Sequence, residues 1–200
     1  MHNFEFVQCR LYALVLVALS GCGTLPQVED DPRLARSRDV VEVFASGLQT
    51  ELRKALLAGG LPAAISVCKD FAPAVASELS RQHGAKVGRT SLRVRNAANL
   101  AGEWQVDVLR KFDTRHVTDS DEPLEFFETT ADGEARYMRA IPAADLCLGC
   151  HGTDISPVVR EVLDAFYPYD RARGYRSGDI RGAFSIVWPA EPAGSGAADD

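Results

Sequence analysis

The chain has 200 residues, a formal net charge of −6 at neutral pH and five cysteines. Because nucleic-acid binding depends on clustered lysine and arginine side chains, this acidic balance argues against a nucleic-acid partner. The length suffices for one domain with a hydrophobic core rather than for several domains.

The N-terminal residues resemble the signal peptide of a bacterial lipoprotein. The apolar run Leu11–Leu19 is too short to span a bilayer stably but has the length of a signal-peptide core. It ends in Leu19-Ser20-Gly21-Cys22, which is similar to a lipobox, where the signal is cut before the cysteine and the thiol receives a lipid. The sequence thus predicts a signal peptide over residues 1–21 and lipidation of Cys22. Ordinary cleavage nearby and an uncleaved anchor remain as alternatives.

A lipid on Cys22 predicts that the mature chain is anchored to a membrane and faces the periplasm or the cell exterior. Gly23 stands where an aspartate commonly retains lipoproteins at an inner membrane, so the outer membrane is favoured in a cell with two membranes. Residues 22–35 are predicted to be a tether, and residues 191–200, which have little to bury, a disordered tail.

Two helices are predicted at the start of the domain, which we assign to residues 36–190. Apolar residues recur at three- and four-residue steps from Val40 to Leu56, the stripe of an amphipathic helix, which Gly59-Gly60 ends. Pro62 opens a second helix that continues to Leu79, with a kink expected at Pro73.

The following elements are a mixture of helices and strands. A third helix is predicted over Glu103–Arg115, and Leu124–Thr130 with Glu134–Ile141 reads as a β-hairpin. A short helix is predicted after Asp154 and a last strand over Ala183–Trp188. Long helices followed by hairpin strands predict an α+β domain with an antiparallel sheet.

The segment Cys147-Leu148-Gly149-Cys150-His151 has the C-x-x-C-H spacing of a c-type haem attachment site. Two thiols three residues apart reach the two vinyl groups on one edge of a porphyrin, and the next residue offers its imidazole to the iron. A zinc site is the alternative, but it needs four ligands and usually a second Cys or His pair, which the sequence lacks. The motif predicts one covalent haem c with His151 as an iron ligand.

Cys68 is left over once the other cysteines are assigned. Cys9 lies in the predicted signal peptide, Cys22 is predicted to carry lipid, and Cys147 and Cys150 belong to the haem motif. A single thiol in an oxidising compartment then has two interpretations. It is either a small buried hydrophobic residue or a second, thiolate ligand to the haem iron.

Several blocks, in this order, resemble a family of bacterial haem c proteins long catalogued as a domain of unknown function. The blocks are Ala64–Pro73, Val87–Leu92 with Arg95-Asn96, Tyr137, Cys147–Gly152 and Gly178–Gly182. The resemblance covers roughly residues 40–190. It implies a PAS-like fold with one covalent haem, in a stand-alone secreted protein or in the extracytoplasmic part of a sensor kinase.

The resemblance also implies a ligand set. In that family the iron is held by the motif histidine and a cysteine, which match His151 and Cys68. The rival distal ligands are His83 and His116, both in polar surroundings, and Met138, on a predicted strand where methionine is more often core filler. Water or an open site is the remaining alternative.

The haem propionates require cationic or hydrogen-bonding partners. By their place in the blocks, Arg89, Arg95 and Tyr137 are the candidates, against the alternative that they are ordinary surface residues.

Two classes of function remain. The first is a lipid-anchored haem c protein that passes electrons to a partner protein or senses redox state, or binds CO or NO once the thiolate leaves the reduced iron. The second is a small haem c oxidoreductase or peroxidase with an open distal site. Peroxidase chemistry needs a distal acid–base group, usually histidine, whereas Cys68 in the sixth position would block that face. The sequence therefore favours the protein without enzymatic activity.

Overall fold

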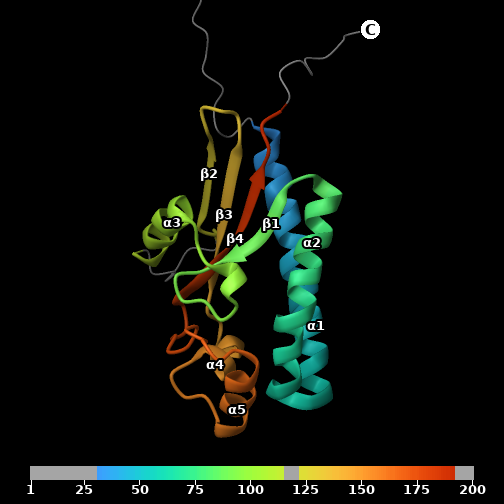
Figure 1. Ribbon diagram of the computed structural model, residues 1–200, viewed down its shortest axis with the longest axis vertical. Helices are drawn as coiled ribbons and strands as arrows, with labels where there is room; N and C mark the ends of the chain where they lie inside the picture. The colour runs from blue at the N-terminus through green and yellow to red at the C-terminus, as the bar shows by residue number, and fades with distance from the viewer. Residues whose placement is uncertain (1–30, 115–121, 192–200) are drawn as a thin grey trace, which may run out of the picture.

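The computed structural model describes residues 31–114 and 122–191 (Figure 1). The predicted signal peptide, Cys22, most of the tether, His116 and all of the predicted tail except residue 191 lie outside the described residues.

A four-stranded antiparallel sheet with the order β1-β4-β3-β2 forms the centre of the fold. The strands are β1 (Lys86–Thr90), β2 (Glu125–Thr129), β3 (Ala135–Pro142) and β4 (Ile180–Trp188). The helices are α1 (Pro32–Ser66), α2 (Ala72–His83), α3 (Glu103–Asp113), α4 (Asp145–His151) and α5 (Pro157–Phe166). The predicted α+β fold with an antiparallel sheet and long N-terminal helices is confirmed. The sequence pattern does not predict β1, because this strand is short and lacks a clear apolar alternation.

Helices cover both faces of the sheet (Figure 1). On one face α1 and α2 pack over a core in which Phe44 and Ile186 are fully buried. On the other face α3 packs over Met138, which is also fully buried. Because successive side chains of a strand point to opposite faces, Met138 and its neighbour Tyr137 contribute to different cores.

The start of α1 differs from the predicted domain boundary. The helix begins at Pro32, within the predicted tether of residues 22–35. The Asp31 carboxylate caps it by accepting a hydrogen bond from the Arg33 backbone N–H at 2.9 Å. Proline at the first helical position costs no hydrogen bond, because that N–H would be unpaired in any case.

The helical hairpin of α1 and α2 is interrupted at two places that the sequence predicts. Gly59 and Gly60 leave helical geometry, and the φ of 67° at Gly60 favours glycine. A single π-helical turn, Val67–Phe71, then precedes α2. It coincides with the kink expected from Pro73, which has no N–H to donate to the carbonyl one helical turn earlier. Cys68 lies in this turn, and π-helical turns are frequent at functional sites.

Helices α4 and α5 form a small layer beyond one end of the sheet, beside the second segment of α1 (Figure 1). Ile65 of α1 packs with Val159 and Leu163 of α5, and all three are buried. Cys150 of α4 contacts the same cluster. This packing places the C-x-x-C-H helix next to the turn that carries Cys68.

Candidate functional site

The C-x-x-C-H motif forms helix α4, and two glycines allow its close packing. A Cβ on Gly149 would lie 3.0 Å from the Leu61 side chain, so glycine lets α4 approach α1. A Cβ on Gly152 would lie 2.5 Å from the Leu148 carbonyl oxygen, which leaves no room for a side chain directly after the motif. Both motif thiols are half-buried, and neither forms a disulfide with another described cysteine. The motif helix is thus held tightly against α1.

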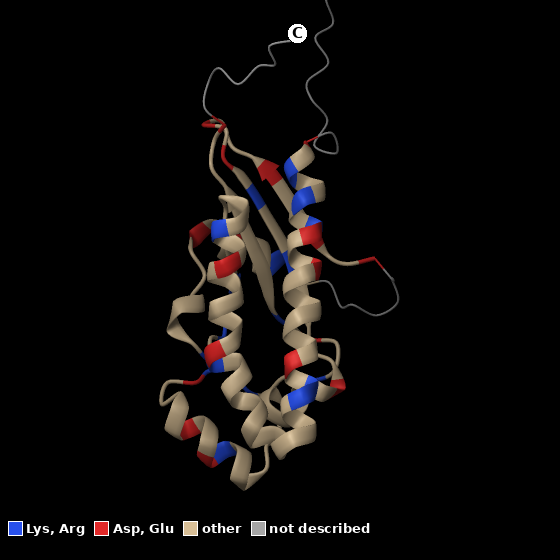
Figure 2. Ribbon diagram, turned by 90° about the vertical axis from the view of Figure 1, so that its right-hand side faces the viewer, with Lys and Arg blue, Asp and Glu red and all other residues tan. Residues whose placement is uncertain are grey.

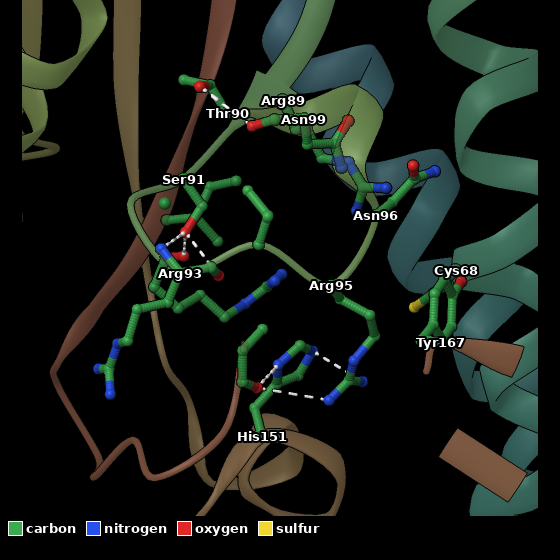
Figure 3. Close-up of a pocket in the computed structure, with 15 residues that line it drawn as sticks. Cys68, Arg89, Thr90, Ser91, Arg93, Arg95, Asn96, Asn99, His151 and Tyr167 are labelled. Carbon is green, nitrogen blue, oxygen red and sulfur yellow. Dashed lines mark hydrogen bonds between the residues drawn. The ribbon is translucent and has the colours of Figure 1, made fainter. Parts of the chain in front are cut away.

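The imidazole of His151 is held in one orientation. Its Nδ1 lies 2.7 Å from the Ala172 carbonyl oxygen, which can only accept, so Nδ1 carries the proton and Nε2 faces the cavity (Figure 3). Burial, followed by the charges of Arg181 and Arg95, holds the pKa of His151 well below its usual value. The imidazole is therefore neutral near pH 7, the form in which histidine binds a metal ion.

Cys68 approaches the same space from the turn between α1 and α2. It is half-buried and is not in a disulfide with the other described cysteines. Figure 3 shows its sulfur beside the Tyr167 ring, on the side of the cavity formed by the long helices, with His151 on the α4 side. Burial and then the nearby Cys68 raise the pKa of Tyr167 to about 12, so its hydroxyl stays protonated.

Two cavities meet between Cys68 and His151. The apolar cavity lies between α1 and α4 and has about 460 Å³ of empty space, its opening to solvent included. Its hydrocarbon wall consists of Leu52, Leu56, Leu61, Ala64, Ile65 and Leu146. Most of this wall lies within residues 55–68, which carry no charged side chain (Figure 2). The polar cavity is partly open to solvent and has about 560 Å³ of empty space, its opening included. Both are lined by Cys68, Arg95, His151 and Arg181, so they are two ends of one site.

Four arginines, Arg89, Arg93, Arg95 and Arg181, line the polar cavity with little negative charge to balance them. Arg95 pairs at 3.1 Å with Asp170, whose carboxylate also binds Arg173 at 2.8 Å. Within the described residues, Arg89 and Arg181 form no salt bridge. The Nε atoms of Arg95 and Arg181 are buried, and no described residue forms a hydrogen bond with them. Because unpaired buried donors are costly, this arrangement suits an anionic ligand.

Arg95 connects these charges to the motif. Its Nη2 donates to the Cys150 carbonyl oxygen at 2.5 Å, and its Nη1 lies 3.4 Å from His151 Nε2. Arg89 sits deeper, where burial and then the charge of Arg181 lower its pKa. A bound anion would relieve this repulsion.

Most of the predicted site residues line these cavities: Cys68, Arg89, Arg95, Cys147, Cys150 and His151. Tyr137 does not. It is fully buried in the core under α1, and its hydroxyl donates to the Glu125 carboxylate at 2.6 Å. Burial and this carboxylate raise the pKa of Tyr137. Its position therefore corrects the expectation of a propionate partner, because the strand directs this side chain into the core.

The rival distal ligands within the described residues also lie elsewhere. His83 ends α2, with its ring 6.4 Å from that of Trp188, and lines neither cavity. Met138 is fully buried under α3 on the opposite face of the sheet. Of the predicted distal candidates in the described part of the chain, only Cys68 faces His151 across the site.

Sequence reasoning did not single out Arg181. Gly182 pairs with Ile141 and Ile180 with Pro142, so Arg181 is the extra residue of a β-bulge in β4. A bulge redirects a side chain, and here the arginine lines both cavities. The one sequence signal is that Arg181 lies just before the mostly apolar segment predicted as the last strand.

Comparison with a solved structure supports the fold. The crystal structure of the cyanobacterial haem-protein Tll0287 matches with a TM-score of 0.58 and 24% sequence identity, covering 82% of this chain and 99% of that chain. A comparison with curated proteins found no match. The model of the Tll0287-like family matches residues 27–189, which include every described helix, strand and cavity residue. The chain therefore belongs to the Tll0287-like family.

Proposed function

We propose that this chain binds one c-type haem. Cys147 and Cys150 would form the thioether bonds, and His151 and Cys68 would be the two axial ligands. The observation that carries the proposal is that Cys68, far from the motif in sequence, lines the same two cavities as His151. The solved relative is described as a haem-protein, which agrees with this assignment.

The distribution of apolar and charged side chains in the site fits a haem, which has an apolar ring and two carboxylates on one edge. The motif thiols line the apolar cavity, while Arg89 lines the polar one. The buried Nε atoms of Arg95 and Arg181, which have no hydrogen-bond partner among the described residues, would find acceptors in the propionates. We therefore propose Arg89, Arg95 and Arg181 as the propionate partners.

When bound, the haem supplies a one-electron couple between ferric and ferrous iron. On the protein side, Ala172 orients the neutral imidazole, and a thiolate at Cys68 would favour the ferric state and so would lower the reduction potential. We infer a role in electron transfer or redox sensing with an unidentified partner protein. Loss of the thiolate on reduction would also open a position for CO or NO.

A peroxidase role has less support. It requires a distal acid–base group, and within the described residues no histidine other than His151 lines either cavity. Arginine and asparagine side chains there can bind anions but do not exchange protons near neutral pH.

Replacing both motif cysteines, Cys147→Ala with Cys150→Ala, should abolish covalent haem. After denaturing electrophoresis, the wild-type band should retain haem stain and the variant band should not, because only thioether bonds survive denaturation. Cys68→Ala is the matched control, since it removes a thiol from the same cavities without touching the motif. Loss of stain from the denatured wild type would refute covalent attachment.

We also propose that the mature chain is anchored by lipid at Cys22, on the periplasmic or outer face of a membrane. The support is the apolar run followed by the lipobox-like Leu19–Cys22. Wild-type protein should partition into detergent, and Cys22→Ala should be soluble or remain unprocessed. Cys9→Ala, in the part to be removed, should behave as wild type. Soluble wild-type protein cleaved elsewhere would contradict the anchor.

A further inference from the structure

The turn that carries Cys68 has little support of its own. It is the single π-helical turn Val67–Phe71, where the α-helical hydrogen-bond pattern is interrupted, and none of its residues is fully buried. Cys68 lies at the second position of this turn and is half-buried. The direction of the thiol therefore depends on contacts that other elements make with the turn.

Tyr167 makes such a contact from inside the site. It directly follows α5, is only 8% exposed and packs in one cluster with Ile65 of α1 and Leu163 of α5. Its ring lines the polar cavity beside the Cys68 sulfur (Figure 3). A sulfur atom beside an aromatic ring is a favourable contact. Because α5 holds the ring in place, the ring limits the positions that the sulfur can take.

Phe166, the last residue of α5, holds the same turn from outside. The Lys69 Nζ atom lies 4.3 Å from the centroid of the Phe166 ring, which makes a cation–π contact. Lys69 directly follows Cys68 in the turn. The contact thus fixes the backbone next to the thiol, and because Phe166 is 40% exposed it is a moderate one.

The residues after Tyr167 continue to the other side of the site. The Asp170 carboxylate binds Arg95, and the Ala172 carbonyl oxygen accepts the hydrogen bond that orients His151. The end of α5 and the residues that follow it therefore contact the turn of Cys68 on one side and the imidazole of His151 on the other.

We propose that Tyr167 is a positioning residue for Cys68, and that its ring keeps the thiol directed across the cavity toward His151. The Lys69–Phe166 contact supports the same turn from the solvent side. This inference rests on the proposed function, in which Cys68 binds the haem iron.

Removing the ring has two expected consequences. The sulfur gains freedom, so ligation of the iron by Cys68 becomes incomplete and part of the ferric haem becomes high spin. A thiol that leaves the iron is also exposed to the open polar cavity, where it can react with an alkylating reagent. The two consequences are measured independently, the first on the haem and the second on the sulfur.

The test uses the mature holoprotein and the variant Tyr167→Leu. Electron paramagnetic resonance gives the high-spin fraction, and mass spectrometry after treatment with iodoacetamide gives the alkylation rate of the peptide that contains Cys68. Tyr167→Leu should show a mixture of spin states and about five- to tenfold faster alkylation than the wild type. Phe166→Leu, which changes a partly exposed residue and leaves the core intact, should speed alkylation about two- to fivefold.

Two further variants show whether the ring itself is responsible. Tyr167→Phe keeps the ring and should restore the wild-type spin state and alkylation rate. Tyr169→Leu is the matched control, because Tyr169 lies in the same segment but is 88% exposed and lines neither cavity of the site. Wild-type values in Tyr167→Leu, or equal changes in Tyr167→Leu and Tyr169→Leu, would overturn the positioning role.

The wild-type spectrum separates this inference from the proposed function. A wild-type haem without thiolate features would refute ligation by Cys68 and the positioning role together. Thiolate features that are the same in the wild type and in Tyr167→Leu would refute the positioning role alone and leave the ligand assignment in place.

Discussion

Replacing Cys68 by alanine should move the ferric haem from low spin toward high spin and raise its reduction potential. The side chain lines both cavities opposite His151, and its removal would leave the sixth position to water. An anionic thiolate favours ferric iron, so its loss should make the iron easier to reduce and raise its reduction potential. Optical and electron paramagnetic resonance spectra with a redox titration measure both effects. Covalent haem should be retained, because Cys147 and Cys150 are untouched.

The controls for this variant are the other predicted distal ligands. His83→Ala and Met138→Leu should keep the wild-type spectrum and potential, since His83 lies beside Trp188 and Met138 under α3. If Cys68→Ala also kept the wild-type spectrum, the thiol would be only a half-buried apolar contact. His116, which lies outside the described residues, would then be the next residue to replace.

The site residues that could be predicted from the sequence are recognisable either from their local spacing in a motif or from the number of cysteines in the chain. Cys147, Cys150 and His151 fall within one short helix, so their geometry hardly depends on the rest of the fold. Cys68 was reached by elimination and by resemblance, and the structure brings it to the same cavities. The two breaks in the N-terminal helices were equally predictable, because Gly59-Gly60 and Pro73 act through local backbone chemistry.

Features that depend on long-range register could not be predicted in this way. Strand β1 exists because it pairs with β4, almost a hundred residues later, and its own sequence contains a central glycine. The side chain of Tyr137 faces α1 because of the register of β3 against β4. Arg181 reaches the cavities through a bulge that appears only when these strands are paired.

Replacing Asp170 by asparagine should lower the free energy of unfolding by about 3–5 kcal/mol, because breaking a buried ion pair leaves an uncompensated charge. The Asp170 side chain is 1% exposed and binds Arg95 at 3.1 Å and Arg173 at 2.8 Å. Arg95 is itself 10% exposed and donates to the Cys150 carbonyl oxygen, so the loss should also loosen the motif helix. Denaturant unfolding of the holoprotein at neutral pH measures the change.

Asp164→Asn is the matched control. This carboxylate pairs with the same Arg173 at 2.5 Å, but its side chain is 59% exposed, so its loss should cost less than about 1 kcal/mol.

The pH dependence of stability gives a second check on Asp170. Burial alone would raise the pKa of Asp170, but hydrogen bonds from Arg173 and Arg95 outweigh it and lower the pKa. The wild type should therefore keep this stabilisation above about pH 4 and lose it as the pH falls through the depressed pKa, so that its advantage over Asp170→Asn shrinks in acid. An equal loss in both variants at neutral pH, or a difference that persists in acid, would show that the Asp170–Arg95 pair does not stabilise the site.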